Sequence, residues 1–144
     1  MILTSGKFPS LAVFLRVKQH SSRYYNPTSY SGLETHISNS YANSLLQLMH
    51  FTPLIRNLAL QHVATVDCKS DLCLLCEMGF LFDMLEKAEG SICQATNFLK
   101  TFSNYPQVGP LGLLEENAHN SSLTAMLQGL TRFLLERVAQ EHTR

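Results

Sequence analysis

The sequence contains no tryptophan, no long apolar run and few charged side chains, which make up 15% of its 144 residues. Eleven basic residues balance eleven acidic ones, and no basic run occurs, so there is no electrostatic surface for direct binding of nucleic acid or anionic lipid. The apolar run from Leu11 to Leu15 is too short for a signal peptide or a membrane span. We therefore expect an intracellular protein that does not contact membranes.

The lack of a secretory signal also decides how the four cysteines are interpreted. Such a chain is expected to keep its thiols reduced rather than to form disulfides. The cysteines are Cys68, Cys73, Cys76 and Cys93.

The length is sufficient for one domain with a hydrophobic core and too short for two. Residues 1–23 alternate short apolar and basic patches, so we expect a strand near Leu11 to Val17 and irregular structure around it. Beyond Ser40 the apolar residues recur at helical spacing, which predicts a mainly α protein. The expected helices span 40–50, 53–61, 71–88, 92–102 and 122–141.

Capping residues support these boundaries. Asn39 or Ser38 is the expected N-cap of the first helix, Pro53 follows Thr52 at the start of the second, and Ser70 precedes the third, which Gly90 ends. The third helix has few polar residues, so we expect it to be the central one. Two inward faces are predicted, one on the second helix (Leu54, Ile55, Leu58, Ala59) and one on the last (Leu123, Leu127, Leu130, Leu134, Val138).

The segment Gly32 to Gln47 resembles the nucleophile box of ubiquitin-specific proteases. In that pattern Ser40 stands where the family has its catalytic cysteine, and Thr35 stands where the family has an asparagine that donates to the oxyanion. The packing positions of the box are kept: Gly32, Leu33, Tyr41, Asn43, Ser44, Leu46 and Gln47.

The two replacements remove the chemistry that the family uses. A serine hydroxyl is nearly un-ionised at neutral pH and needs a well-placed base, and the family's histidine motif lies beyond this length of chain. We expect His36 to be an ordinary loop residue, Ser40 to help cap the helix, and Asn43 and Gln47 to fix neighbouring loops. The sequence therefore predicts no catalytic residue: Ser40 is a degenerate nucleophile position and Thr35 a degenerate oxyanion position.

Cys68, Cys73 and Cys76 raise the question of a zinc site. Structural zinc needs four convergent ligands, and the fourth would have to be His62 or the distant Cys93. Cys73 and Cys76 fall between leucines inside the expected third helix, which is typical of core cysteines. The zinc finger of ubiquitin-specific proteases lies later in their domain and uses two Cys-x-x-Cys pairs. We therefore expect no metal and no cofactor in this chain.

A wider resemblance runs from Tyr24 to Val138, through stretches such as Leu-Leu-Gln-Leu-Met-His, Pro-Leu-Ile-Arg-Asn and Cys-Leu-Leu-Cys-Glu-Met-Gly-Phe. These are similar to the ubiquitin-hydrolase-like domain in the catalytic subunit of the poly(A)-nuclease deadenylation complex. The resemblance implies that residues 24–144 are part of this domain: the helical lobe of a papain-like α+β fold, incomplete here. Residues 1–23 do not match the family.

For function, the resemblance implies an inactive scaffold segment of a poly(A)-specific deadenylase. The implied partners are a pseudokinase-type regulatory subunit and the exonuclease domain of the same protein, with poly(A) RNA contacted indirectly. Mg²⁺ is expected only in that exonuclease domain, and the implied location is the cytoplasm, including P-bodies.

Two other functions fit the residues. The chain could be part of a deubiquitinase that uses Ser40 as its nucleophile, which predicts a downstream histidine motif. It could also be a free-standing helical adaptor, which predicts a cooperatively unfolding protein of this length. A partial papain-like domain predicts instead an exposed apolar patch and marginal stability.

Overall fold

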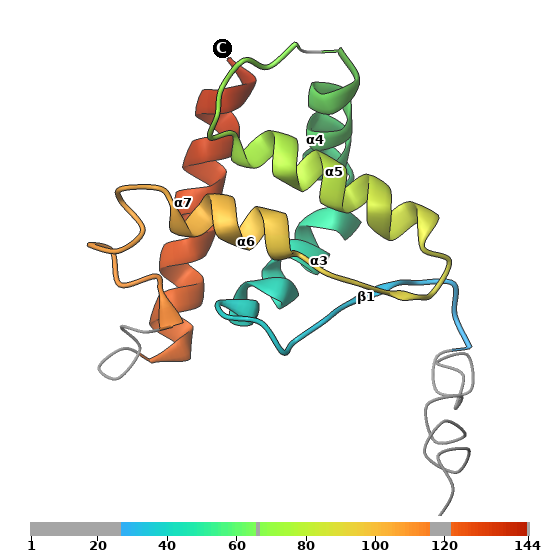
Figure 1. The fold of residues 1–144 in the computed structure, drawn as a ribbon, viewed down its shortest axis with the longest axis horizontal. Coiled ribbons are helices and arrows are strands. Elements are labelled where there is room, and N and C mark those ends of the chain that lie inside the picture. Colours follow the sequence, from blue (N-terminus) through green and yellow to red (C-terminus); the bar gives the residue numbers. More distant parts are fainter. Residues whose placement is uncertain (1–26, 66, 116–121, 144) are drawn as a thin grey trace, which may run out of the picture.

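The computed structural model describes residues 27–65, 67–115 and 122–143. The strand expected near 11–17 lies outside them. The described residues form five α-helices, one 3-10 helix and two short strands (Figure 1). None of these helices is both long and apolar enough to cross a membrane. In chain order the elements are β1 (Gly32–Leu33), η1 (Ser40–Ala42), α3 (Asn43–Phe51), α4 (Pro53–Thr65), α5 (Leu74–Lys87), β2 (Ile92–Cys93), α6 (Thr96–Ser103) and α7 (Leu123–His142).

Helix α5 is the central element, as its apolar composition predicted. Leu75, Met78 and Phe82 are fully buried on it, and α4, α6 and α7 all pack against it (Figure 1). The mainly α prediction is confirmed. Three phenylalanines, Phe82, Phe98 and Phe102, are the largest fully buried side chains of the core between these helices.

The start of α5 differs from the prediction. Ser70 is not its cap, because the Ser70 hydroxyl donates to the carbonyl of Leu72. The N-cap is Cys73, which has an extended backbone and whose sulfur accepts a hydrogen bond from the amide of Cys76. The thiol performs the capping role that the sequence assigned to a hydroxyl three residues earlier, so the helix begins at Leu74 rather than at Asp71.

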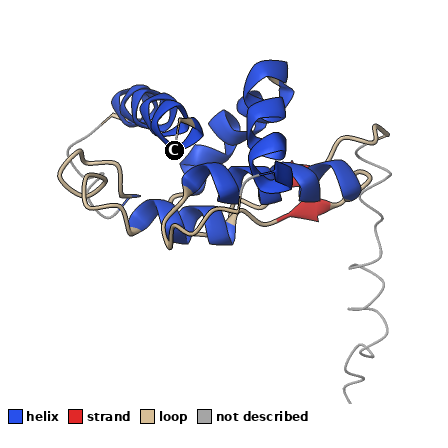
Figure 2. Ribbon diagram, turned by 90° about the horizontal axis from the view of Figure 1, so that it is seen from above, coloured by secondary structure: helices blue, strands red, loops and turns tan. Residues whose placement is uncertain are grey.

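The strand pair interrupts the helix expected at 92–102. Gly90 turns the chain with a φ of 87°, as its predicted role at the end of α5 requires. The chain then forms β2, which pairs in parallel with β1 in the register Gly32↔Ile92 and Leu33↔Cys93. Figure 2 shows the strands in red at one edge of the helical layer. Because this pairing holds residues 92–93, α6 begins only at Thr96.

Helices α4 and α7 confirm their predicted starts, with one correction to the inward face of each, whereas α3 begins at Asn43 because residues 40–42 form η1. Helix α4 begins at Pro53 and α7 follows Ser122, whose hydroxyl accepts from the amide of Ala125. The prediction that Leu54 faces inward is wrong, because its side chain is 70% exposed. The inward face of α4 consists of Ile55, Ala59 and His62. Leu123 is also exposed, since the buried face of α7 begins one turn later. That face comprises Met126, Leu130, Phe133, Leu134, Val138 and Glu141.

Helices α4 and α5 pack closely against each other at Gly79. A Cβ atom there would lie 2.1 Å from Cγ2 of Val63 and 2.5 Å from the carbonyl oxygen of Ala59. A side chain can turn aside, but a helical carbonyl cannot move without shifting α4. The crossing therefore requires glycine.

We predict that Gly79→Ala lowers the free energy of unfolding by about 1–3 kcal/mol, because the overlap outweighs the roughly 1 kcal/mol that alanine gains in a helix. Urea denaturation measures the change. Gly109→Ala is the matched control, since a Cβ atom there meets nothing within 4 Å and should change the value by less than about 0.5 kcal/mol. Equal stabilities of the two variants would contradict the close packing of α4 on α5.

Candidate functional site

The loop from β1 to α3 carries the residues of the nucleophile box. Ser40 is the first residue of η1, so the predicted placement at a helix N-terminus is confirmed, although the first turn is a 3-10 turn. Its hydroxyl does not cap the helix as predicted. It donates instead to the carbonyl of Thr35 at 3.0 Å, across the preceding loop. The Ser40 proton is therefore held by a backbone carbonyl and not by a base.

The backbone amides around Ser40 are also engaged. The amide of Ser40 donates to the carbonyl of Ile37 at 3.2 Å, and the amide of Ala42 donates to the carbonyl of Asn39 at 3.1 Å. In an active papain-like site, amides at this helix start would face a developing oxyanion. These two amides are already satisfied inside the loop.

Asn39 and Glu115 form a reciprocal pair beside Ser40. The amide of Asn39 donates to Oε2 of Glu115 at 2.8 Å, and the amide of Glu115 donates to Oδ1 of Asn39 at 2.9 Å. Asn39 is the N-cap residue of η1, as predicted, with a left-handed backbone at a φ of 63°. Its side chain makes no capping hydrogen bond to η1, because its Oδ1 atom accepts from the amide of Glu115 instead. The carboxylate of Glu115 lies at the start of η1, where it opposes a second negative charge. No sequence signal marked Glu115, which is 76 residues away along the chain.

Tyr41 and Asn43 attach the loop to two other segments. The Tyr41 hydroxyl donates to the carbonyl of Leu113 at 2.6 Å, and burial, then the charge of Glu115, raise its pKa to about 12. The amide group of Asn43 donates to the carbonyl of Glu34 at 2.7 Å. The prediction that Asn43 fixes a neighbouring loop is confirmed. Through these two hydrogen bonds the retained positions hold the loop in place.

The two other candidates of the box, Thr35 and His36, are exposed. The histidines that are buried lie elsewhere in the described structure. His50 packs edge-on against the ring of Phe82, where burial lowers its pKa, and His62 lies in the last turn of α4. Within the described residues, the hydroxyl of Ser40 donates to a backbone carbonyl and not to an imidazole.

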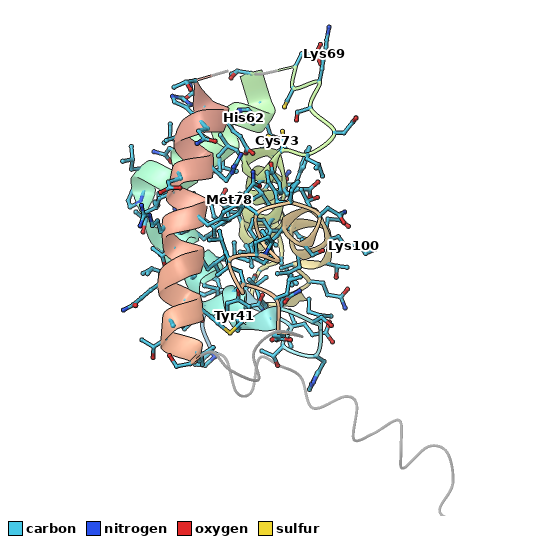
Figure 3. All side chains as sticks on the ribbon, turned by 90° about the vertical axis from the view of Figure 1, so that its left-hand side faces the viewer. Tyr41, His62, Lys69, Cys73, Met78 and Lys100 are labelled. Atoms are coloured by element: carbon cyan, nitrogen blue, oxygen red, sulfur yellow. The ribbon has the colours of Figure 1, made fainter. Side chains whose placement is uncertain are left out.

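Three of the four cysteines lie apart from this loop, together with His62 (Figure 3). The ligand atoms of His62, Cys68, Cys73 and Cys76 all lie within 4.8 Å of one another. Cys93 is not among them: it is buried in β2, and its thiol donates to the carbonyl of Met84. Cys73 precedes α5 rather than lying inside it, so the view of Cys73 and Cys76 as two cysteines within one core helix is wrong.

Comparison with known proteins places the chain in a family. The family model described as ubiquitin carboxyl-terminal hydrolase matches residues 31–144. The chain belongs to the ubiquitin carboxyl-terminal hydrolase family. Its residues 31–144 include the whole box and every helix described above.

Two similar proteins carry the same name. The PAN2-PAN3 deadenylation complex catalytic subunit PAN2 of Chaetomium thermophilum is 67% identical over 119 residues, which cover 83% of this chain and 10% of the relative. The corresponding protein of Emericella nidulans is 61% identical over 122 residues, covering 85% of this chain and 10% of the relative. The chain thus spans about a tenth of the length of these relatives.

Solved structures agree in fold. The Neurospora crassa Pan2 catalytic unit, with protease and nuclease domains, matches with a TM-score of 0.78 and 47% identity over 84% of this chain and 20% of that one. The Saccharomyces cerevisiae PAN2 pseudoubiquitin-hydrolase matches with a TM-score of 0.64 and 29% identity, over 83% of this chain and 29% of that one. The predicted fold, the helical lobe of an incomplete ubiquitin-hydrolase-like domain, is confirmed.

Proposed function

We propose that this chain is a catalytically inactive ubiquitin-hydrolase-like lobe that serves as a scaffold in the catalytic subunit of a poly(A)-specific deadenylase. The observation that carries the proposal is the 67% identity over 119 residues to a PAN2 catalytic subunit. The lobe acts in poly(A) tail shortening through the exonuclease domain of the same polypeptide, which uses Mg²⁺. Its other partner is a pseudokinase-type regulatory subunit, poly(A) RNA is contacted indirectly, and the location is the cytoplasm, including P-bodies.

Inactivity toward ubiquitin follows from the hydrogen bonds of the box. Ser40 donates to the carbonyl of Thr35, and the Glu115 carboxylate lies at the amide of Asn39. We therefore expect that restoring a thiol would not restore a thiolate, because in the described residues the Ser40 hydroxyl has a carbonyl as its partner and the amides of Ser40 and Ala42 are already paired. A serine-dependent deubiquitinase, the alternative from the enzyme class, requires both.

We predict that neither the natural chain nor Ser40→Cys forms a covalent adduct with a ubiquitin probe that carries a C-terminal electrophile. Intact-mass spectrometry detects the adduct, and an active ubiquitin-specific protease serves as the positive control for the probe. Labelling of the natural chain that disappears in Ser40→Ala would contradict the proposal and favour a serine-dependent hydrolase.

The scaffold role requires a surface that the rest of the domain covers. Leu48, Phe51 and Leu54 are 64%, 53% and 70% exposed and follow one another along the end of α3 and the start of α4; we call them the α3–α4 apolar surface. Neighbouring exposed apolar residues of this size mark a contact site. The chain matches only 29% of the yeast pseudoubiquitin-hydrolase chain. We assign this surface to contact with the remainder of that domain.

If the rest of the domain covers this surface, Leu54→Lys should have a small effect on the stability of the 144-residue chain and a large one in the full-length relative. In the 144-residue chain, Leu54→Lys changes the free energy of unfolding by less than about 0.5 kcal/mol, because the side chain is already in water. In a chimera, where the matching 119-residue part of this chain replaces its counterpart in the Chaetomium thermophilum relative, the same change buries an unpaired charge and costs about 2 kcal/mol or more. Chemical denaturation of both proteins measures the difference.

Leu123→Lys is the matched control, because Leu123 is 59% exposed but lies in the first turn of α7. It should have small effects in both contexts. Equally small effects of Leu54→Lys in the chain and in the chimera would contradict the covered surface. They would favour a free-standing helical adaptor.

A further inference from the structure

Four ligand side chains converge at the end of the molecule opposite the nucleophile box. Figure 3 shows His62 and Cys73 near the Lys69 loop at one end, and Tyr41 of the box towards the other. The Sγ atom of Cys73 lies 3.4 Å from Nε2 of His62, and all four ligand atoms, including those of Cys68 and Cys76, lie within 4.8 Å of one another. Tetrahedral zinc with bonds of about 2.3 Å to sulfur separates its ligands by roughly 3.8 Å. No two ligand atoms of the cluster are therefore more than about 1 Å farther apart than in a tetrahedral zinc site.

The chain reaches this cluster from three separate elements. His62 comes from the last turn of α4, Cys68 from the loop after it, and Cys73 and Cys76 from the start of α5. Cys73 is extended and Cys76 is in the first turn of the helix, which turns both sulfurs of the Cys-x-x-Cys pair to the same side. Core packing alone does not require three thiols and an imidazole to meet at one point.

Backbone amides already point at two of the sulfurs. The amide of Cys76 donates to Sγ of Cys73 at 3.4 Å, and the amide of Ser70 donates to the sulfur of Cys68. Such hydrogen bonds, together with the positive end of a helix dipole, stabilise thiolate ligands. Burial has the opposite effect on Cys73 and Cys76 and raises the pKa of both thiols, so without a cation they stay protonated.

The C-terminal end of α7 fixes the turn that carries the Cys-x-x-Cys pair. Glu141 is buried there, and its carboxylate accepts from the amide of Leu75 at 2.8 Å and from the hydroxyl of Tyr105 at 2.6 Å. The thiol of Cys73 also donates to this carboxylate, at 3.6 Å. A cavity of about 240 Å³ adjoins the cluster and is lined by His62, Cys68, Cys73 and Glu141 among others. Glu141 thus fixes the Cys-x-x-Cys turn on one side of the cluster, and the cavity on the other side provides a path by which a metal ion can enter.

We propose that His62, Cys68, Cys73 and Cys76 bind one structural zinc ion. Three thiolates and one imidazole form a closed donor set, and sulfur and nitrogen ligands select zinc over Mg²⁺ or Ca²⁺. Binding replaces three thiol protons, which leave to solvent, by three Zn–S bonds and one Zn–N bond, with no change in oxidation state. The ion joins α4, the following loop and α5. The site concerns the stability of this chain alone and is independent of the proposed scaffold function.

The test uses the 144-residue chain produced in zinc-supplemented medium and dialysed against metal-free buffer. Elemental analysis should find about one zinc per chain. X-ray absorption at the zinc edge should show three sulfurs at about 2.3 Å and one nitrogen at about 2.0–2.1 Å. This measurement of the ligands uses the natural chain, so it tests the zinc site even if a variant fails to fold.

Two variants and a control assign the ligands. Cys68→Ser changes a half-buried loop residue, so the helical circular dichroism should be retained while zinc affinity, measured by chelator competition, falls by more than about 100-fold. Cys73→Ser should lose zinc similarly. Cys93→Ser is the matched control, because this buried cysteine lies outside the cluster, and it should keep about one zinc per chain.

Any of three results would contradict the proposed zinc site. The first is that the natural chain is folded but holds less than about one tenth of a zinc ion after incubation with excess metal. The others are that X-ray absorption finds fewer than three sulfur ligands, or that Cys68→Ser and Cys93→Ser contain equal amounts of zinc. Each means that the cysteines are core residues that happen to be adjacent.

Discussion

The close packing of α4 on α5 at Gly79 is the constraint on which both sites depend. Since a Cβ at this position would overlap the carbonyl of Ala59, the axes of the two helices can approach only because glycine is present. The crossing brings the last turn of α4 to the start of α5, which sets His62 beside Cys73. At its other end α5 leads through the Gly90 turn into β2, which pairs with β1 and thereby positions the loop that ends at Ser40.

The nucleophile box keeps its packing residues, and several of its polar groups make hydrogen bonds within the chain. The Ser40 hydroxyl donates to a carbonyl, the amides at the helix start are paired, and the Glu115 carboxylate occupies the positive end of η1. The same helix terminus that stabilises an oxyanion in an active hydrolase here stabilises an internal contact. This is consistent with the pseudoubiquitin-hydrolase description of the yeast relative.

Helical periodicity predicted the existence of most helices, and local signals predicted the starts at Pro53 and after Ser122 and the turn at Gly90. The failures involve contacts between distant residues. The side chain of Asn39 bonds to Glu115 instead of capping η1, and residues 92–93 form a strand because they pair with β1. Two-residue strands are too short to leave a periodic pattern, so only the resemblance of the box indicated a papain-like fold.

The proximity of the four side chains of the cysteine cluster could not be predicted from the sequence for a related reason. A helix that includes Cys73 separates this residue from Cys68, and spacing along the chain leaves the fourth candidate ligand open between His62 and Cys93. Spacing along the chain does not reveal that the end of α4 places His62 beside the three cysteines, because this placement depends on how α4 crosses α5 at Gly79. The Cys-x-x-Cys pair was visible in the sequence, but convergence of four ligands is a tertiary property.

The central claim is that this lobe works as part of a deadenylase polypeptide. The most direct measurement is the mass of the cellular polypeptide that contains the peptide from Gly32 to Gln47, by denaturing gel and mass spectrometry of the excised band. We expect a species far larger than the 16.2 kDa of this chain, since the chain spans 10% of its Chaetomium thermophilum relative, and we expect exonuclease peptides in the same band. A single species at 16.2 kDa, without nuclease peptides, would contradict it.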